Sequence, residues 1–193
     1  MAMPKPNVRE KIIGGASDVF HRKGFNASTV DNIVDTAGVP KGSFYNHFKS
    51  KEDLALEVID RYRAAFEHGS LIDYERSPVE RLAVYFEYLA DRFERDGFDK
   101  GCLLGNFANE MADHSPAIRA RLTAVFDEWT DALAVVIREG QQRGEIGSPQ
   151  PAARLAGFLL NASEGAIVRT RCSKDRAAME DFRALAFSVL DIR

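Results

Sequence analysis

The stretch STVDNIVDTAGVPKGSFYNHFKSKED, residues 28–53, is the part of the chain on which the prediction of the fold depends. Its first half has one apolar face with the i, i+3, i+4, i+7 spacing of a helix, formed by Val30, Ile33, Val34 and Ala37. Ser28 or Thr29 is placed to cap the start of that helix. Gly38 suits the left-handed position after a helix and Pro40 cannot continue one, so we expect the helix to end there.

A second, short helix is expected over residues 41–48. Phe44 and Phe48 are four residues apart and would face the core. The residues that would then point outward are Gly42, Ser43, Tyr45 and Asn46, flanked by Lys41 and His47. Such a face suits the groove of a DNA duplex, because it can approach closely, bond base edges and contact phosphates. The alternative is a helical hairpin with a solvated outer face, and the spacing alone leaves that alternative open.

The sequence of residues 39–54, VPKGSFYNHFKSKEDL, together with the Gly38 that precedes it, closely resembles the signature of the TetR family of bacterial repressors. The positions that match it are Gly38, Val39, Lys41, Gly42, Ser43, Phe44, Tyr45, Phe48, Lys51 and Leu54. The resemblance implies a helix-turn-helix whose second helix enters the major groove of operator DNA. This motif is specific, and it covers about the first quarter of the chain.

The resemblance also assigns DNA contacts to particular residues. These are Thr29, Lys41, Gly42, Ser43, Tyr45, His47 and Lys51, with Asn46 at a variable contact position. One departure from the family pattern is Pro40, where the family usually has a capping Ser. Any contact that this hydroxyl makes in other members is therefore absent here.

The charge of the chain is unevenly distributed along its 193 residues. The net charge is −3, yet residues 1–51 carry eight Lys and Arg against four Asp and Glu. Residues 52–193 carry eighteen against twenty-five. A basic head on an acidic body suits a protein that meets phosphate at one end.

Several other classes of protein find no support in the sequence. No secretory segment and no apolar run near the ~18 residues of a membrane span is found, so we expect a cytoplasmic protein. Cys102 and Cys172 are too few for a disulfide framework, and the scattered His residues predict no metal site. No catalytic motif is recognisable, so we expect neither an enzyme nor a cofactor.

The remaining sequence predicts an all-α chain. Helices are expected over about 8–23, 50–66, 77–96, 102–111, 115–140, 151–171 and 174–190, with Ser173 capping the last. We assign residues 1–50 to a three-helix DNA-binding head and 51–193 to a helical ligand-binding and dimerisation body. Gly14 and Gly15 inside the first helix are unusual, since each Gly costs ~1 kcal/mol relative to Ala. Either close approach by another helix or plain weakness of this helix would account for them.

In TetR-like proteins the body encloses a ligand pocket, and the resemblance extends to that region. The candidate ligand or sensor residues are Cys102, Asn106, Phe107, Trp129 and Asn161. The run from Lys100 to Leu104, KGCLL, is similar to a subset of the family that carries a Gly-Cys-Leu element at the start of the sixth helix. Some members of that subset respond to electrophiles or oxidants through this cysteine. The other interpretation is that Cys102 is a small buried apolar residue, as most free Cys are.

The last two helices carry apolar stripes, at Leu155, Leu159, Ala162 and Ala166 and at Phe182, Leu185 and Val189. In the family the corresponding helices pair with their twofold mates, so we expect a homodimer. The predicted function is repression through a palindromic operator, relieved by a small-molecule or electrophile signal. A helical enzyme or ligand carrier without a DNA role is the alternative, and an activator of the same fold is a third possibility.

Overall fold

The structure is a computed structural model that describes residues 7–65 and 69–192. In these ranges the chain forms α-helices and one 3₁₀ turn, and the single β feature is a bridge between Ile146 and Ile192. The predicted all-α class is confirmed. None of the described helices is both long and apolar enough to cross a membrane.

Contacts divide the chain into two compact units that each draw on two parts of the sequence. The first unit contains the described residues up to Ala65 together with Leu103–Thr123. The second unit contains residues 69–102 and 124–192. The described part of the predicted head, residues 7–50, therefore lies inside the first unit.

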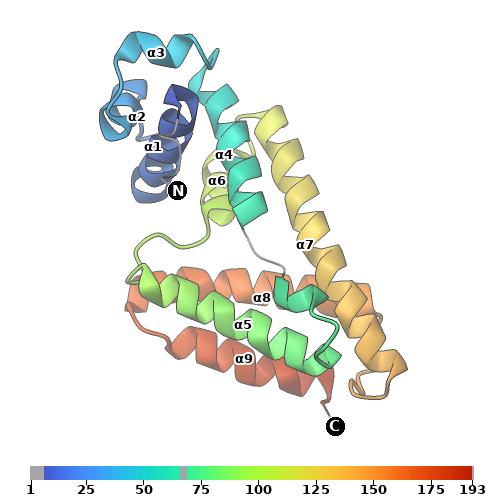
Figure 1. Ribbon diagram of the computed structural model, residues 1–193. Helices are drawn as coiled ribbons and strands as arrows, with labels where there is room; N and C mark the ends of the chain where they lie inside the picture. The colour runs from blue at the N-terminus through green and yellow to red at the C-terminus, as the bar shows by residue number, and fades with distance from the viewer. Residues whose placement is uncertain (1–6, 66–68, 193) are drawn as a thin grey trace, which may run out of the picture. The chain divides into compact units, whose positions relative to one another are not determined.

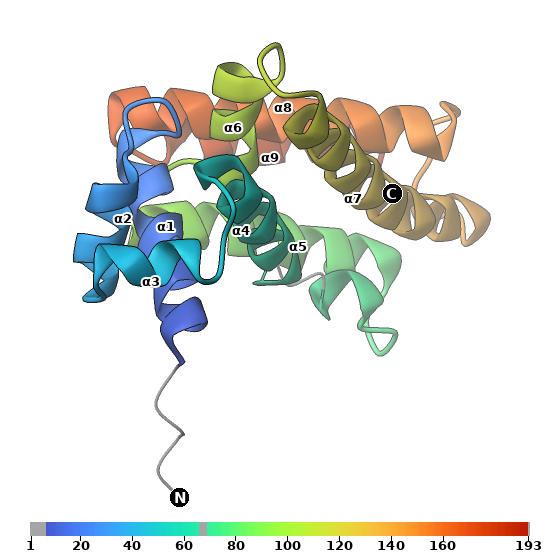
Figure 2. The ribbon, with the colours of Figure 1, turned by 90° about the horizontal axis from the view of Figure 1, so that it is seen from above.

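The first unit begins with three helices, α1 (Val8–Lys23), α2 (Val30–Ala37) and α3 (Lys41–Tyr45), which are labelled in Figures 1 and 2. Its other elements are α4 (Lys51–Ala65), α6 (Leu103–Met111) and the start of α7 (Pro116–Gln142). Phe107 of α6 packs edge-on against Phe20 of α1, with 5.4 Å between the ring centroids, and also contacts Phe25. The later segment thus completes the core of the earlier one.

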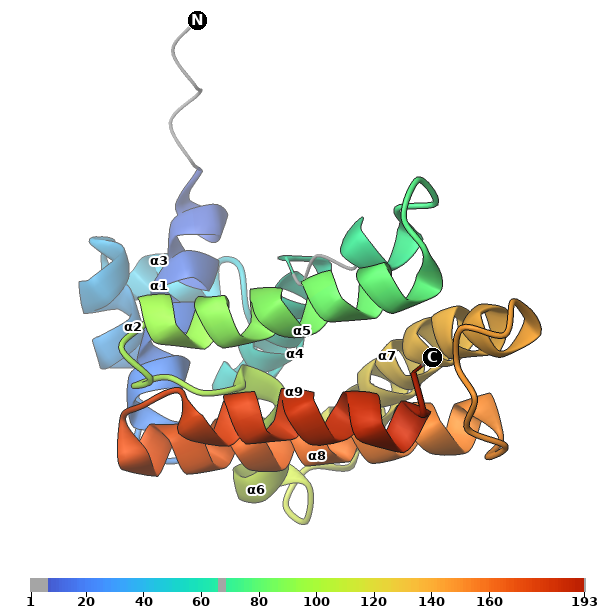
Figure 3. The same cartoon turned by 90° about the horizontal axis from the view of Figure 1, so that it is seen from below.

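The second unit is a helical bundle. It consists of the 3₁₀ turn Gly69–Ile72, α5 (Pro78–Arg95), the remainder of α7, α8 (Ala152–Ser173) and α9 (Ala177–Leu190). Helices α8 and α9 lie side by side, as Figure 3 shows, and α5 packs on α9. Phe86 of α5 meets Phe182 of α9 at 5.1 Å between centroids.

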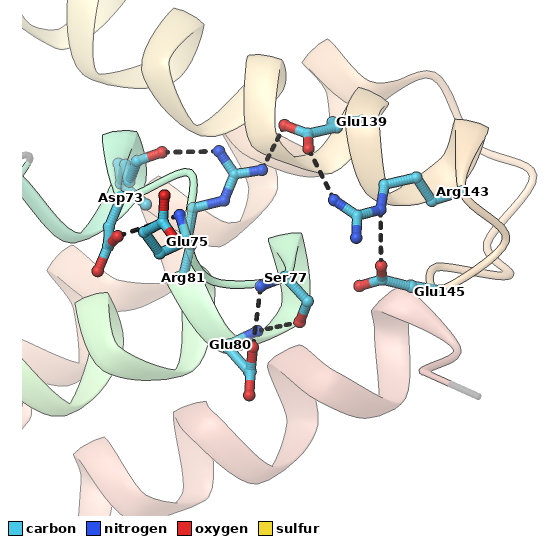
Figure 4. Close-up of polar contacts among 9 residues, drawn as sticks. Asp73, Glu75, Ser77, Glu80, Arg81, Glu139, Arg143 and Glu145 are labelled. Atoms are coloured by element: carbon cyan, nitrogen blue, oxygen red, sulfur yellow. Dashed lines mark hydrogen bonds and ion pairs between the residues drawn. The ribbon is translucent and has the colours of Figure 1, made fainter.

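Polar contacts around the buried Arg81 connect the start of α5 with the end of α7 (Figure 4). Arg81 is 1% exposed; its guanidinium donates to the Leu71 carbonyl at 3.2 Å and to the Glu139 carboxylate. Arg143 in turn bonds Glu139 at 3.1 Å. This network connects the 3₁₀ turn to α7, so the segment between the helices expected over 50–66 and 77–96 contains a short ordered 3₁₀ helix.

Helix caps account for most of the predicted boundaries. At α5 the Ser77 hydroxyl accepts from the Glu80 N–H at 3.2 Å, and the Glu80 carboxylate accepts from the Ser77 N–H at 2.9 Å. The prediction that Ser173 caps the last helix is wrong. Ser173 ends α8, and Asp175 accepts from the Ala177 N–H at 3.1 Å instead.

The two glycines of α1 differ in their surroundings. A Cβ atom added to Gly15 would lie 3.0 Å from both the Ala37 nitrogen and the Ile33 oxygen of α2. A Cβ atom added to Gly14 would meet nothing within 4 Å. Close approach by another helix therefore explains Gly15, while nothing in the structure explains Gly14.

We expect opposite effects from Ala at these two positions. Gly14→Ala should raise the free energy of unfolding by about 1 kcal/mol, because Ala favours the helical state. Gly15→Ala should lower it, because pushing α2 away costs on the order of 1–3 kcal/mol and exceeds that gain. Thermal unfolding followed by circular dichroism measures both, and equal shifts of the two variants would contradict the assignment.

Candidate nucleic-acid interface

The angle between α2 and α3 is set by local backbone contacts. The Thr29 hydroxyl caps α2 by accepting from the Asn32 N–H at 3.1 Å. Gly38 has a left-handed backbone, with φ 63° and ψ 41°, and the Val39 N–H closes the helix end on the Val34 carbonyl at 3.0 Å. The chain then enters α3 at Pro40, whose fixed φ suits a helix start although it offers no capping hydroxyl.

Helix α3 is anchored by aromatic residues and presents its other face to solvent. Phe44 and Phe48 are buried, as predicted. Tyr45 is 60% exposed, and a Cβ atom added to Gly42 would meet nothing within 4 Å. Asn46 and His47 are also exposed, whereas Ser43 is half-buried. Regular α-helix ends at Tyr45 rather than at 48, and a turn bonded to the Phe44 carbonyl carries the chain on to Phe48.

Lys41, the first residue of α3, is paired with an acidic residue of α2. Its ammonium lies 2.8 Å from one carboxylate oxygen of Asp31 and 3.0 Å from the other. Hydrogen bonding and charge attraction from Asp31 raise the pKa of Lys41. Both side chains are more than half exposed, so this pair forms part of the outward face beside α3.

Lys51 has a structural role that the sequence did not reveal. Its ammonium donates to the Phe25 and Ser28 carbonyls, at 2.7 Å each, and lies 4.2 Å from the centre of the Phe25 ring. Partial burial lowers the pKa of Lys51, with the negative charge of Glu110 acting in the opposite direction. Lys51 therefore holds the loop that leads into Thr29, and its contact with phosphate stays a prediction.

Glu110 of α6 holds the same loop from another side. Its carboxylate accepts from the Asn26 N–H at 2.8 Å and fills the space beside Gly24, where an added Cβ atom would lie 2.1 Å from a carboxylate oxygen. Glu110 lies near the end of α6, where the sequence alone favours a solvated side chain. No local pattern could have connected it with a loop 84 residues earlier.

The five predicted ligand or sensor residues fall into both units. Asn106 and Phe107 belong to the first unit, where Asn106 is half-buried and Phe107 is a core residue. In the second unit Trp129 is buried against Phe126, while Asn161 is exposed on α8. A surface pocket of about 510 Å³ in that unit is lined by none of the five; its residues are Tyr88, Asp91, Glu94 and Arg95.

Cys102 lies directly before α6 and is 4% exposed. Its thiol is hydrogen-bonded to the carboxyl of Glu164 on α8, and burial raises the pKa of Glu164. Burial likewise raises the pKa of Tyr85, whose phenol interacts with both groups. Lys100, two residues before Cys102, pairs instead with Asp96 at 3.3 Å. Glu164 was missed, although it falls on the apolar spacing between Leu160 and Ile167 and so was detectable.

The apolar stripes of α8 and α9 are only partly core. Leu155, Leu159 and Phe182 are buried within the chain. A different α8 face, spaced i, i+3, i+7, i+10, is exposed, and it consists of Phe158, Asn161, Gly165 and Val168. On α9, Leu185 is 66% exposed and Val189 is 39% exposed. The second unit thus presents apolar side chains to solvent on two adjacent helices.

Comparisons with known proteins agree with this geometry. Residues 12–58 match the model of bacterial regulatory proteins of the tetR family, and residues 78–186 match that of the tetracyclin repressor-like C-terminal domain. The chain is 34% identical to the transcriptional repressor DhaR of Mycobacterium sp. strain GP1, over 97% of this chain and 94% of that protein. It is 32% identical to the transcriptional regulator AcuR of Cereibacter sphaeroides, over 84% and 75%. A crystal structure of a regulatory protein TetR from Rhodobacter sphaeroides superposes with a TM-score of 0.89 at 29% identity, covering 94% of this chain and 98% of that one.

Proposed function

Because the chain belongs to the TetR family of ligand-responsive transcriptional regulators, we propose that it represses genes through a palindromic operator, as a homodimer. The observation that carries this proposal is the exposed face of α3. The buried Phe44 and Phe48 hold that helix in place, and Gly42 and Tyr45 remain open to a duplex. Repression requires no catalytic step and no cofactor, and it takes place in the cytoplasm, where a bacterial chromosome lies.

Selection from a pool of duplexes tests this proposal. With about 20 randomised base pairs, the pool can contain two half-sites one helical turn apart. We expect an inverted repeat to be enriched, and its affinity to fall by about a thousandfold or more between about 50 and 200 mM salt. Failure to enrich any sequence would contradict repression through DNA.

The dimer proposal rests on the exposed apolar side chains of the second unit. Phe158 and Val168 of α8 and Leu185 and Val189 of α9 are solvent-exposed in the single chain. Gly165, between Phe158 and Val168 on the same face, has open space around it and would let another helix approach closely. Two copies pairing through this face would bury it and hold two α3 helices on one duplex.

We further propose that Cys102 receives the inducing signal. Glu164 accepts a hydrogen bond from the thiol, which makes it the group to which the proton passes when the sulfur attacks an electrophile. Helix α6 begins at the next residue, and Glu110 near its end holds the loop before Thr29. A shift of α6 would then reach α2, so inducer and operator would oppose one another.

Glu164→Gln should slow the reaction of Cys102 with N-ethylmaleimide at pH 7 by about tenfold, because the thiol loses its proton acceptor. Peptide mass spectrometry follows the two cysteines separately. The exposed Cys172 is the internal control, and its rate should be the same in both proteins. If Cys102 reacts equally fast in the variant, Glu164 has no such role; if Cys102 reacts in neither protein, it is a packing residue.

A further inference from the structure

The pair formed by Asp31 and Lys41 joins the first turns of α2 and α3. The ammonium and carboxylate are 2.8 Å apart, and each side chain is more than half exposed. Lys41 starts the helix that carries Tyr45, and Asp31 lies two residues after the cap Thr29. The carboxylate of Asp31 therefore lies on the exposed face that, under the proposed function, contacts DNA.

The helix dipole favours a carboxylate in the first turn of α2, but it does not explain the pairing of Asp31 with Lys41. Exposed ion pairs contribute little to the free energy of unfolding, because water screens both charges. On a surface that approaches a polyanion, a carboxylate also repels the phosphates that supply most of the binding energy. Asp31 therefore weakens DNA binding wherever it fails to find a hydrogen-bond donor on the duplex.

Donors for a carboxylate are scarce on DNA. Phosphate and sugar oxygens accept hydrogen bonds, so the suitable partners in the major groove are the amino groups of the bases. Carboxylates accept from N4 of cytosine, while Lys donates to O6 and N7 of guanine. In a G·C pair these groups lie next to each other on the same edge. The adjacent ammonium and carboxylate of Lys41 and Asp31 match that order of acceptor and donor.

We propose that Asp31 and Lys41 together read a G·C base pair in each half-site of the operator. Asp31 accepts from the cytosine amino group, and Lys41 donates to the guanine. The ion pair keeps the two side chains next to each other before DNA arrives. An A·T or C·G pair places a carbonyl oxygen where the cytosine amino group would lie, and a T·A pair places a methyl group where Lys41 would meet guanine N7. Asp31 and Lys41 therefore lower affinity for non-operator DNA, and Asp31 is a specificity-determining residue.

Asp35 provides a matched control. It is also an exposed acidic residue of α2, but it lies in the last turn of the helix, one turn after Asp31. Asp31→Asn and Asp35→Asn remove the same charge from the same helix. A purely electrostatic effect of α2 on DNA would therefore appear in both variants.

The test is selection from the randomised duplex pool with wild type, Asp31→Asn and Asp35→Asn, followed by fluorescence anisotropy on the enriched duplexes. We expect wild type and Asp35→Asn to enrich a G·C pair at one fixed position of each half-site. Asp31→Asn should lose that preference or move it to A·T, since Asn pairs with adenine. Its ratio of operator to random-duplex affinity should fall by about tenfold or more, the expected effect of one base-edge contact.

Two results would overturn the inference. One is that Asp31→Asn enriches the same duplexes as wild type and binds all of them more tightly by one common factor. The other is that Asp35→Asn changes the selected base pair equally. The inference rests on the proposed function, but the two fail differently: if wild type enriches no duplex at all, it is DNA-dependent repression that fails.

Discussion

Gly42→Glu is expected to abolish operator binding while leaving the protein folded, with a loss of about 100-fold or more in affinity. The added side chain has open space in the free protein, and Gly42 lies in a helix that Glu can also form. On DNA the same side chain would keep the backbone of α3 away from the groove. It would also add one negative charge per subunit against the phosphates.

Gly14→Glu is the matched control for this experiment. Gly14 is likewise an exposed helical glycine with nothing within 4 Å of an added Cβ atom, but it belongs to α1. Both variants gain the same charge and the same volume. Circular dichroism should show both folded, and anisotropy should show operator binding lost only in Gly42→Glu. Retained affinity in Gly42→Glu would exclude α3 as the DNA-reading helix.

Leu185→Asp is expected to convert the dimer into monomers, weakening the dimer by about 100-fold, which corresponds to roughly 2.7 kcal/mol. Leu185 is 66% exposed in the single chain, so the change does not disturb its own core. A twofold interface contains each residue twice, so two carboxylates would be placed in an apolar contact. Operator affinity should fall with dimerisation, because a monomer reads only one half-site.

Val135→Asp controls for the introduction of a charge at an exposed apolar residue. Val135 of α7 is 52% exposed and lies in the same unit. Analytical ultracentrifugation at micromolar concentration should give a dimer for wild type and Val135→Asp and a monomer for Leu185→Asp. Leu159→Asp is not a useful probe of the interface, since Leu159 is fully buried and the change should unfold the chain. A dimeric Leu185→Asp would mean that the copies associate through another face.

The features that the sequence predicted well are those encoded by neighbouring residues. Thr29 and Gly38 each act within a few residues, so their roles follow from spacing alone. The burial of Phe44 and Phe48 was also predictable, because residues four apart lie on the same face of a helix. This is why the helix-turn-helix could be recognised before any tertiary contact was known.

The features that the sequence did not predict depend on contacts between distant segments. Lys51 carries a basic side chain that suits phosphate, yet it bonds the Phe25 and Ser28 carbonyls. Glu110 reaches across 84 residues, and the need for Gly15 is set by the backbone of α2. The apolar residues of α8 were identified, but their spacing alone does not show which of them are buried within the chain. Leu159 is buried, whereas the neighbouring Phe158 is exposed to solvent.

The way the chain threads through the first unit limits how this protein can be cut into pieces. A fragment ending at Ala65 would lose Phe107, Glu110 and the start of α7. It would thereby expose Phe20 and Phe25, and it would also lose the 3.2 Å pair between Arg121 and Asp60. In limited proteolysis we therefore expect no stable N-terminal product of this length. A protease-resistant product from this unit should instead be a nicked assembly of two peptides, one of them contributed by α6 and the beginning of α7.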